Sequence, residues 1–327
     1  MTQPAPLLDG LLFIAFFTAV TITGVLFGRY MAHVFSGGDY SRGIPGGALE
    51  ARLFRFIGTS AGEEEDWMGY AREMLIFNGI GFIALLALLL LQGYLPLNPE
   101  GFGAFDPPGT ALHTAASFVT NTNYQIYAGE ASASYLTQMA GFTVQNFLSA
   151  ATGICIAIAV MRGGVTRRST DRIGNFRVDV TRCVLYILLP VAFLAALLLV
   201  SQGVIQNVDP PYVHAAGYGP AGPQTIAMGP VASQEAVKEF GTNGGGFFNA
   251  NSAHPPYENP TPFTNLVEIF LILLIPVSLP FVFGRMAGPC GRDGPSISSC
   301  SRSTSLPSAR STLPNRTATR SWGGSST

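Results

Sequence analysis

Charged residues are scarce in this sequence, and that scarcity narrows the kinds of protein it can encode. Asp, Glu, Lys and Arg make up 11% of the 327 residues, whereas hydrophobic residues make up 48% and the mean hydropathy is +0.33. A soluble domain of this length would disperse its apolar residues, but here they form long blocks. The formal net charge of −1 provides no basic face for nucleic-acid phosphates. The composition therefore predicts an all-α integral membrane protein with several spans.

Cysteine is also scarce, and its placement excludes the usual cysteine-based sites. The four cysteines form no CxxC pair and have no spacing typical of metal ligands: Cys155, Cys183, Cys290 and Cys300. The first two lie inside apolar stretches, where cysteine packs as a small hydrophobic residue. The cysteines therefore carry no functional signal.

Five apolar windows are long enough to cross a bilayer, which requires roughly 20 helical residues. They cover about 7–28, 75–95, 136–161, 184–200 and 266–283. The first window is longer than the apolar core of a signal peptide and has no basic leader, so we expect a retained anchor. Pro190, Pro276 and Pro280 should kink the last two helices.

Basic residues predict the orientation of these helices. The stretch 74–161 contains no Lys or Arg, and Lys238 is the only basic residue between the fourth and fifth windows. Arginines are concentrated in the other two connections: Arg29, Arg42, Arg52, Arg55 and Arg72 in one, and Arg162, Arg167, Arg168, Arg172, Arg177 and Arg182 in the other. Because basic loops stay in the cytoplasm, the two connections poor in basic residues should face outward, as should the N-terminus.

The two outward connections share one plan. Each has a Pro/Gly-rich stretch, then a short helix-like piece ("TALHTAASFVT" or "VASQEAVKEF"), then an uncharged polar run ("NTNYQ" or "GTNGGG") before the next span. The arrangement helix, pore helix, polar loop, helix therefore occurs twice, at a period of about 110 residues.

This plan divides the chain into six segments. They are an N-terminal membrane helix (1–30), a cytoplasmic loop (31–73), a first helix-pore-helix repeat (74–161), a second cytoplasmic loop (162–182), a second repeat (183–286) and a tail (287–327) that is disordered by composition.

Irregular backbone at membrane depth is tolerated only where it is buried in protein or lines a water-filled cavity. Carbonyl groups that face such a cavity can replace the hydration shell of an ion. Neutral oxygens of Thr, Asn and Gln suit a large monovalent cation, whereas calcium and magnesium usually recruit carboxylates. The polar runs therefore predict ion-selectivity loops with potassium as the natural ion; taken singly, each run is also compatible with an ordinary turn or a flexible glycine link.

Longer motifs carry a family resemblance. They are "TNTNYQIYAGE" (120–130), "GNFRVDVTR" (174–182), "LLVSQGVIQN" (198–207) and "GPVASQEAVKEFGTNGGGFFNANSAHPPYENPTPFTN" (229–265). With these motifs the chain resembles the KdpA family, the potassium-binding A subunits of Kdp-type potassium-transporting ATPases of bacteria and archaea. The similarity extends over about 7–285.

The resemblance implies a fold, a site and partners. The fold is that of the superfamily of potassium transporters, with four helix-pore-helix repeats round a filter and an extra first helix. The implied potassium ligands, mostly through backbone carbonyls, are Asn121, Thr122, Asn123 and Gln125 in the first loop and Gly241, Thr242, Asn243, Gly244 and Gly245 in the second. The subunit binds potassium from outside and hydrolyses no ATP itself, binds no separate cofactor, and acts in the cell membrane with an ATP-hydrolysing B subunit, a C subunit and a small F subunit.

The sequence also departs from the family. Two of the four repeats are recognisable, and from the Ser- and Arg-rich composition after residue 286 we infer an out-of-frame translation, with a genuine regulatory tail as the alternative. An inactive truncated fragment with half a filter is therefore one alternative. Three other functions stay open: a stand-alone potassium channel or transporter of the same superfamily, a broken-helix transporter of organic solutes, and a membrane enzyme that uses His113, His214 or His254 with Glu130, Glu235 or Glu258.

Overall fold

The computed structural model describes residues 6–36, 46–163, 171–214, 224–254 and 257–287. Five helical segments are long and apolar enough to cross a membrane: Leu8–Val34, Trp67–Tyr94, Thr137–Met161, Phe176–Ser201 and Pro262–Met286. These segments confirm the five predicted spans; four of them extend beyond at least one end of the apolar window, and the third coincides with its window to within one residue. The chain is a multi-pass helical membrane protein.

The elements follow in chain order. The α-helices are α1 (Pro6–Val34), α2 (Gly47–Ile57), α3 (Trp67–Leu91), α4 (Pro108–Val119), α5 (Val144–Met161), α6 (Phe176–Arg182), α7 (Leu189–Ser201), α8 (Val231–Phe240) and α9 (Pro262–Met286). Shorter helical turns are η1 (Gln92–Tyr94), η2 (Gly129–Ala131), η3 (Thr137–Thr143) and η5 (Cys183–Leu188). The four strands are β1 (Glu65–Asp66), β2 (Arg172–Gly174), β3 (Tyr212–His214) and β4 (Gln224–Ile226). The strands and α2 were not predicted from the sequence.

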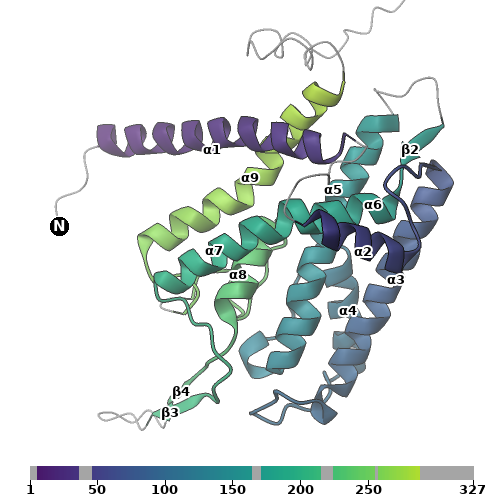
Figure 1. Ribbon diagram of the computed structural model, residues 1–327. Coiled ribbons are helices and arrows are strands. Elements are labelled where there is room, and N and C mark those ends of the chain that lie inside the picture. Colours follow the sequence, from purple (N-terminus) through teal and green to yellow (C-terminus); the bar gives the residue numbers. More distant parts are fainter. Residues whose placement is uncertain (1–5, 37–45, 164–170, 215–223, 255–256, 288–327) are drawn as a thin grey trace, which may run out of the picture.

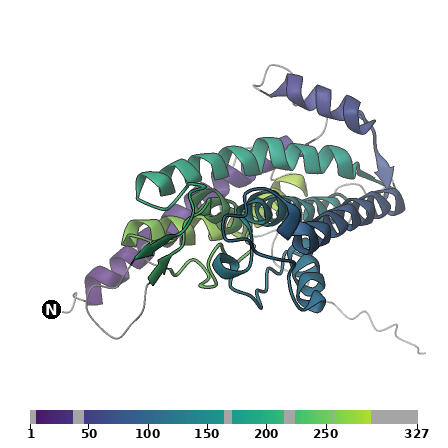
Figure 2. The same ribbon diagram turned by 90° about the horizontal axis from the view of Figure 1, so that it is seen from below.

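The two expected repeats occupy separate sides of the molecule. Helices α3, α4 and α5 lie together on the right of Figure 1, and α7, α8 and α9 lie on the left. The short helices α4 and α8 coincide with the two predicted pore helices, and each lies between two spans in the chain. A view turned by 90° shows the long α1 beside α9, outside both groups (Figure 2).

Two glycines allow α1 to approach α9 closely. A Cβ on Gly28 would lie 2.7 Å from the carbonyl oxygen of Ser278, and one on Gly24 would lie 2.7 Å from Val277. Small residues four positions apart are the usual means by which membrane helices bring their backbones together. The helix preceding the repeats is therefore packed against the end of the second repeat.

Pro190 interrupts the backbone hydrogen bonding of the fourth span, and the structure compensates for it. Proline has no N–H, so the carbonyl of Tyr186, four residues earlier, loses its helical donor. The hydroxyl of Tyr30 on α1 donates to this carbonyl at 2.8 Å, and the preceding turn η5 has π-helical geometry. The freed backbone group is thus satisfied within the protein, as the membrane interior requires. Pro276 and Pro280 lie inside α9.

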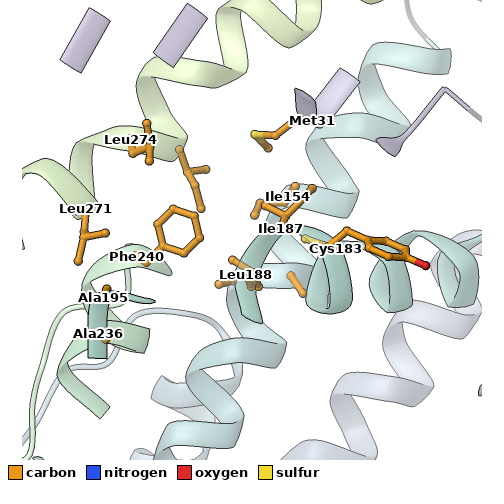
Figure 3. Packing of buried hydrophobic residues seen from close by; sticks show 14 of the residues in the cluster. Met31, Ile154, Cys183, Ile187, Leu188, Ala195, Ala236, Phe240, Leu271 and Leu274 are labelled. Carbon is orange, nitrogen blue, oxygen red and sulfur yellow. The ribbon is translucent and has the colours of Figure 1, made fainter. Parts of the chain in front are cut away.

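The apolar core lies where the two repeats and α1 meet. Figure 3 shows Phe240, at the end of α8, among Leu271 and Leu274 of α9 and Leu188 of η5. Phe240 is 1% exposed. Burial of an aromatic side chain of this size contributes about 1.5–3 kcal/mol, so this contact fixes the end of α8 from which the second loop begins.

A buried ion pair between Arg182 and Glu50, at 2.8 Å, joins the two arginine-rich connections, and Arg162 adds a second link. Arg162 donates to both carboxylate oxygens of Asp179, at 2.6 and 3.0 Å, and to the carbonyl of Phe35 at 2.8 Å. Strands β1 and β2 pair Glu65 with Gly174. Of the arginines used to predict orientation, Arg42, Arg167 and Arg168 lie outside the described residues, as does the predicted tail from residue 288 onward.

Candidate ion-binding site

The first loop (residues 120–130) leaves α4 by a tight series of backbone hydrogen bonds. The N–H of Thr120 donates to the carbonyl of Ala116 at 3.1 Å, that of Asn121 to Phe118 at 3.3 Å, and that of Thr122 to Ser117 at 2.9 Å. The chain therefore turns back over the last turn of the helix instead of extending away from it.

The second loop (residues 241–254) leaves α8 by the same three bonds. The N–H of Gly241 donates to Val237 at 2.8 Å, that of Thr242 to Glu239 at 3.1 Å, and that of Asn243 to Lys238 at 2.9 Å. Each position corresponds to one in the first loop that lies 121 residues earlier, the separation between Gln125 and Gly246. The period of about 110 residues estimated from the sequence is smaller than this separation of 121 residues. The two values differ because the Pro/Gly-rich stretch before the second pore helix is longer than the one before the first.

Left-handed backbone angles recur at equivalent positions of the two loops. The φ angles are 59° at Asn121 and 50° at Asn123, and 55° at Thr242 and 76° at Gly244. Asn and Gly adopt this region readily, but a β-branched residue such as Thr242 does not. Strain of this kind costs about 1–3 kcal/mol and concentrates at functional sites. The shared conformation is therefore imposed by the fold.

Amide side chains connect the two loops directly. The side-chain amide of Asn243 donates to Oδ1 of Asn121. The amide of Gln125 donates to the carbonyl of Gly246 at 2.8 Å. Because these bonds join equivalent regions of different repeats, they fix the separation of the loops and place the two predicted ion-binding segments side by side.

Side chains and a carbonyl of helix α5 form hydrogen bonds with both loops. Asn123 donates to Oδ1 of Asn146, and Asn243 donates to the carbonyl of Asn146 and to Oγ of Ser149, each at 3.2 Å. Ser149 in turn donates to Oδ1 of Asn121 at 2.9 Å. Asn123 and Asn146 are 3% and 1% exposed, so this hydrogen-bond network is enclosed in protein.

The structure thus brings most of the predicted site residues into one assembly. Asn243 and Asn121 are bonded through their side chains, Asn123 donates to Asn146, and Gln125 donates to the carbonyl of Gly246. The hydroxyl of Thr122 lies 2.9 Å from that of Thr120. The glycines contribute backbone only: Gly241 caps α8, and Gly244 and Gly245 have φ angles of 76° and 70°. Because the amides are engaged with protein, the loop carbonyls are the groups best suited to hold an ion.

Sequence reasoning missed three participants. Ser149 and Lys238 gave no signal as site residues. Asn146 lies inside a span, where its side-chain oxygen accepts from Asn123. The signal that could have identified Asn146 is its position, a carboxamide in an otherwise apolar helix.

A cavity of about 410 Å³ adjoins the second loop and connects it with α9. Gly244, Gly245 and Asn251 line it on the loop side, and Glu239 and Glu268 contribute carboxylates. Within the described ranges no three His, Cys, Asp or Glu side chains form a metal-binding group. His113 and His254 instead pack against aromatic rings, those of Tyr124 and Phe248.

Comparison with known proteins agrees with these features. The sequence model of the family described as "Potassium-transporting ATPase A subunit" matches residues 14–304. Among curated proteins, the chain is 52% identical over 302 residues to the potassium-transporting ATPase potassium-binding subunit of Geotalea uraniireducens, covering 84% of this chain and 50% of that protein. It is 54% identical over 280 residues to the subunit of that name from Geobacter metallireducens, covering 80% and 47%.

The subunit from Rhodospirillum centenum gives a third comparison, 52% identical over 282 residues, which covers 86% of this chain and 48% of the relative. The chain therefore spans about half the length of the curated relatives it matches. A family match over most of the chain, together with identities above one half, leads to one assignment: the chain belongs to the family of potassium-transporting ATPase A subunits.

Proposed function

We propose that this chain provides potassium-binding loops of an ATP-driven potassium import pump. Potassium arrives from the outer side of the cell membrane, is held by backbone carbonyls of the two loops, and passes toward a separate ATP-hydrolysing subunit. Relatives that are about half identical over most of this chain carry the name potassium-binding subunit, and in this proposal the chain itself catalyses no hydrolysis.

The observation that carries the proposal is the matched geometry of the two loops. Both leave their pore helices by the same hydrogen bonds and share left-handed angles at equivalent positions. Their amide side chains are bonded to each other and to α5. Such a framework holds neutral carbonyls in fixed positions, and a site built from carbonyls favours potassium over calcium or magnesium.

Two loops provide half of a fourfold filter, so the proposal includes the other half and the rest of the complex. A further polypeptide segment supplies two more repeats, and an ATP-hydrolysing B subunit, a C subunit and a small F subunit complete the pump in the bacterial inner membrane. The N-terminus and both loops face outward, because the arginines gather in the opposite connections.

A complementation experiment tests this proposal. A bacterium deficient in potassium uptake would express the cognate partner subunits with either the 327-residue chain or a full-length version in which the reading frame continues beyond residue 286. We expect only the full-length version to restore growth at limiting potassium. Failure of both would contradict the proposed function, and rescue by the 327-residue chain would contradict the requirement for four repeats.

A stand-alone potassium transporter of the same superfamily is the second candidate. Loops that hold an ion by backbone carbonyls would also serve a channel or transporter driven by the membrane potential, although the long block "GTNGGGFFNANSAHPPYENPTP" favours the pump subunit. Growth restored by the full-length version without any partner subunit would establish this alternative, whereas dependence on the ATP-hydrolysing partner would exclude it.

A further inference from the structure

The second loop lies against a buried lysine that the proposed function does not use. Lys238 is the single lysine in the chain, since the other 17 of its 18 basic residues are arginines. It lies in the last turns of α8 and is 0% exposed. A buried ammonium is costly unless it is paired and hydrogen-bonded, so its partners indicate its purpose.

The ammonium of Lys238 has close partners on three sides. It donates to the backbone carbonyl of Gly245 and to Oγ of Ser252, the latter at 2.5 Å. It also pairs with Oε2 of Glu235 at 3.1 Å, and Oε1 of Glu239 lies 3.7 Å away. An ammonium is a compact charge with three donors, whereas the planar guanidinium of arginine is larger and directs its donors in a fork. The site is therefore built for lysine.

The first repeat has a counterpart at the equivalent position. Ser117 precedes Tyr124 by seven residues, as Lys238 precedes Gly245. Oγ of Ser117 accepts from the N–H of Tyr124 at 2.7 Å and lies 3.3 Å from the carbonyl of the same residue. In both repeats, then, a side chain from the last turns of the pore helix ties the loop residue seven positions later. One tie is a neutral hydroxyl and the other is a cation.

The glycines of the second loop make this contact possible. A Cβ on Gly246 would lie 2.7 Å from Nζ of Lys238 and 2.7 Å from Oε1 of Glu258. Gly245 has a φ angle of 70°, and its N–H donates to Oδ1 of Asn251 at 3.2 Å. Any side chain at residue 246 would displace the ammonium or the carboxylate, so the loop backbone follows the surface of the buried cluster.

We propose that Lys238 is a positioning residue that sets the ion selectivity of the second loop. By binding the carbonyl of Gly245, its ammonium turns that carbonyl away from the ion path and fixes the orientation of the neighbouring backbone, including Gly244. The carbonyl of Gly245 then serves as an anchor and leaves the set of potassium ligands predicted from sequence. This inference rests on the proposed function, because it assigns a role within potassium binding.

Selectivity is the property that depends most directly on such a tie. Discrimination between potassium and smaller sodium requires either a cavity of fixed size or carbonyl dipoles of fixed number and strength. A loop made of three consecutive glycines has the greatest backbone freedom. Without the bond from Lys238, the carbonyls could contract round sodium, so potassium would lose its advantage even in a folded protein.

The test compares variants of the full-length subunit in the assembled complex. Lys238→Met combined with Glu235→Gln removes the tie together with one buried charge of opposite sign, and Glu235→Gln alone keeps the tie and is the matched control. The readout is the ratio of the sodium and potassium concentrations that give half-maximal ATP hydrolysis, measured with equal amounts of assembled complex.

We expect the double variant to lose the preference for potassium by roughly tenfold, the scale of one hydrogen bond to a charged group, and the control to stay within about threefold of the native ratio. Lys238→Gln provides a second test, because glutamine keeps a hydrogen-bond donor but is uncharged and shorter. This variant should lose the preference for potassium by a smaller factor than the double variant. A native ratio in whichever Lys238 variant assembles would overturn the inference. Absence of any potassium-dependent hydrolysis in the native complex would instead overturn the proposed function, and the role of Lys238 with it.

Discussion

The two loops reach the same backbone conformation by different chemistry. The first loop uses side-chain amides, those of Asn121, Asn123 and Gln125, and a serine hydroxyl as its tie to the pore helix. The second loop has glycines at most corresponding positions and is tied by the ammonium of Lys238. The fold therefore specifies the turn, while each repeat stabilises it with different side chains.

The difference has energetic consequences. A neutral hydrogen bond contributes about 0.5–1.5 kcal/mol. Removing one member of a buried ion pair costs about 3–5 kcal/mol, because the remaining charge stays buried without compensation. The second loop should therefore be far more sensitive to single substitutions than the first, and substitutions in the full-length subunit test this difference.

Lys238→Met alone should have the largest effect. It leaves the carboxylates of Glu235, Glu239 and Glu258 buried without their cation, and we expect a loss of about 3–5 kcal/mol in the free energy of unfolding. Thermal unfolding of the purified protein in detergent measures it. Addition of Glu235→Gln should recover part of the loss, since it removes one unpaired charge. A single variant as stable as the native protein would show that the cluster is not the anchor of the second loop.

Gly241→Asp should come next, because this residue begins the second loop. A Cβ there would lie 3.0 Å from the carbonyl of Val237 and 3.1 Å from Ala150, and it would collide with Oδ1 of Asn243. We expect the bond between Asn243 and Asn121 to break and potassium affinity to fall by roughly tenfold or more. The equivalent change in the first loop, Thr120→Asp, replaces an exposed side chain and is the matched control, with a smaller loss.

Gln125→Ala removes one bond between the loops, from its amide to the carbonyl of Gly246. We expect potassium affinity to weaken by about three- to tenfold, the equivalent of one neutral hydrogen bond, with membrane insertion unchanged. Potassium-dependent ATP hydrolysis measures the affinity, and the amount of subunit in the membrane measures insertion. A variant with native affinity would show that the loops do not depend on this contact.

Ser117→Ala tests the neutral tie of the first loop. It removes the acceptor for the N–H of Tyr124 and should cost about 1 kcal/mol of stability, less than a third of the effect of Lys238→Met. The potassium to sodium preference should change little, because the amides of the first loop still hold its backbone. An effect as large as that of Lys238→Met would contradict the distinction between the two loops.

The smallest effect should arise at Glu65, which lies just before the N-terminus of α3 and is part of neither loop. Burial, and then the neighbouring Glu73, raise the pKa of Glu65 from 4.5 to about 7, although Arg177 opposes the shift. The folded state then binds the proton more tightly, so the contribution to stability is full below pH 4.5 and is lost as the pH rises through about 7. Glu65→Gln should flatten the pH dependence of the melting temperature in this window and leave ion selectivity unchanged.

Much of this architecture could be predicted from the sequence. Apolar length gave all five spans, and the helix-like piece "VASQEAVKEF" coincides with α8 from Val231 to Phe240. The sequence also indicated which runs form loops, because irregular polar segments between spans must be enclosed by protein or line a cavity.

Contacts between distant residues could not be predicted in this way. The bond from Tyr30 to the carbonyl of Tyr186 joins residues 156 apart, and the bond from Asn243 to Asn121 joins residues 122 apart. Lys238 looked like an ordinary charge on a short helix, since its burial depends on Gly245, Ser252 and Glu235 meeting round it. The assignment of individual potassium ligands stays a prediction.

Direct potassium binding would show whether the two loops together hold the ion. Equilibrium binding of potassium and of sodium would be measured by calorimetry on the purified full-length complex in native form and with Gln125→Ala or Gly241→Asp. We expect the native complex to prefer potassium and both variants to bind it more weakly, Gly241→Asp most of all. Unchanged potassium affinity in both variants would contradict the assignment of these loops as the ion-binding site.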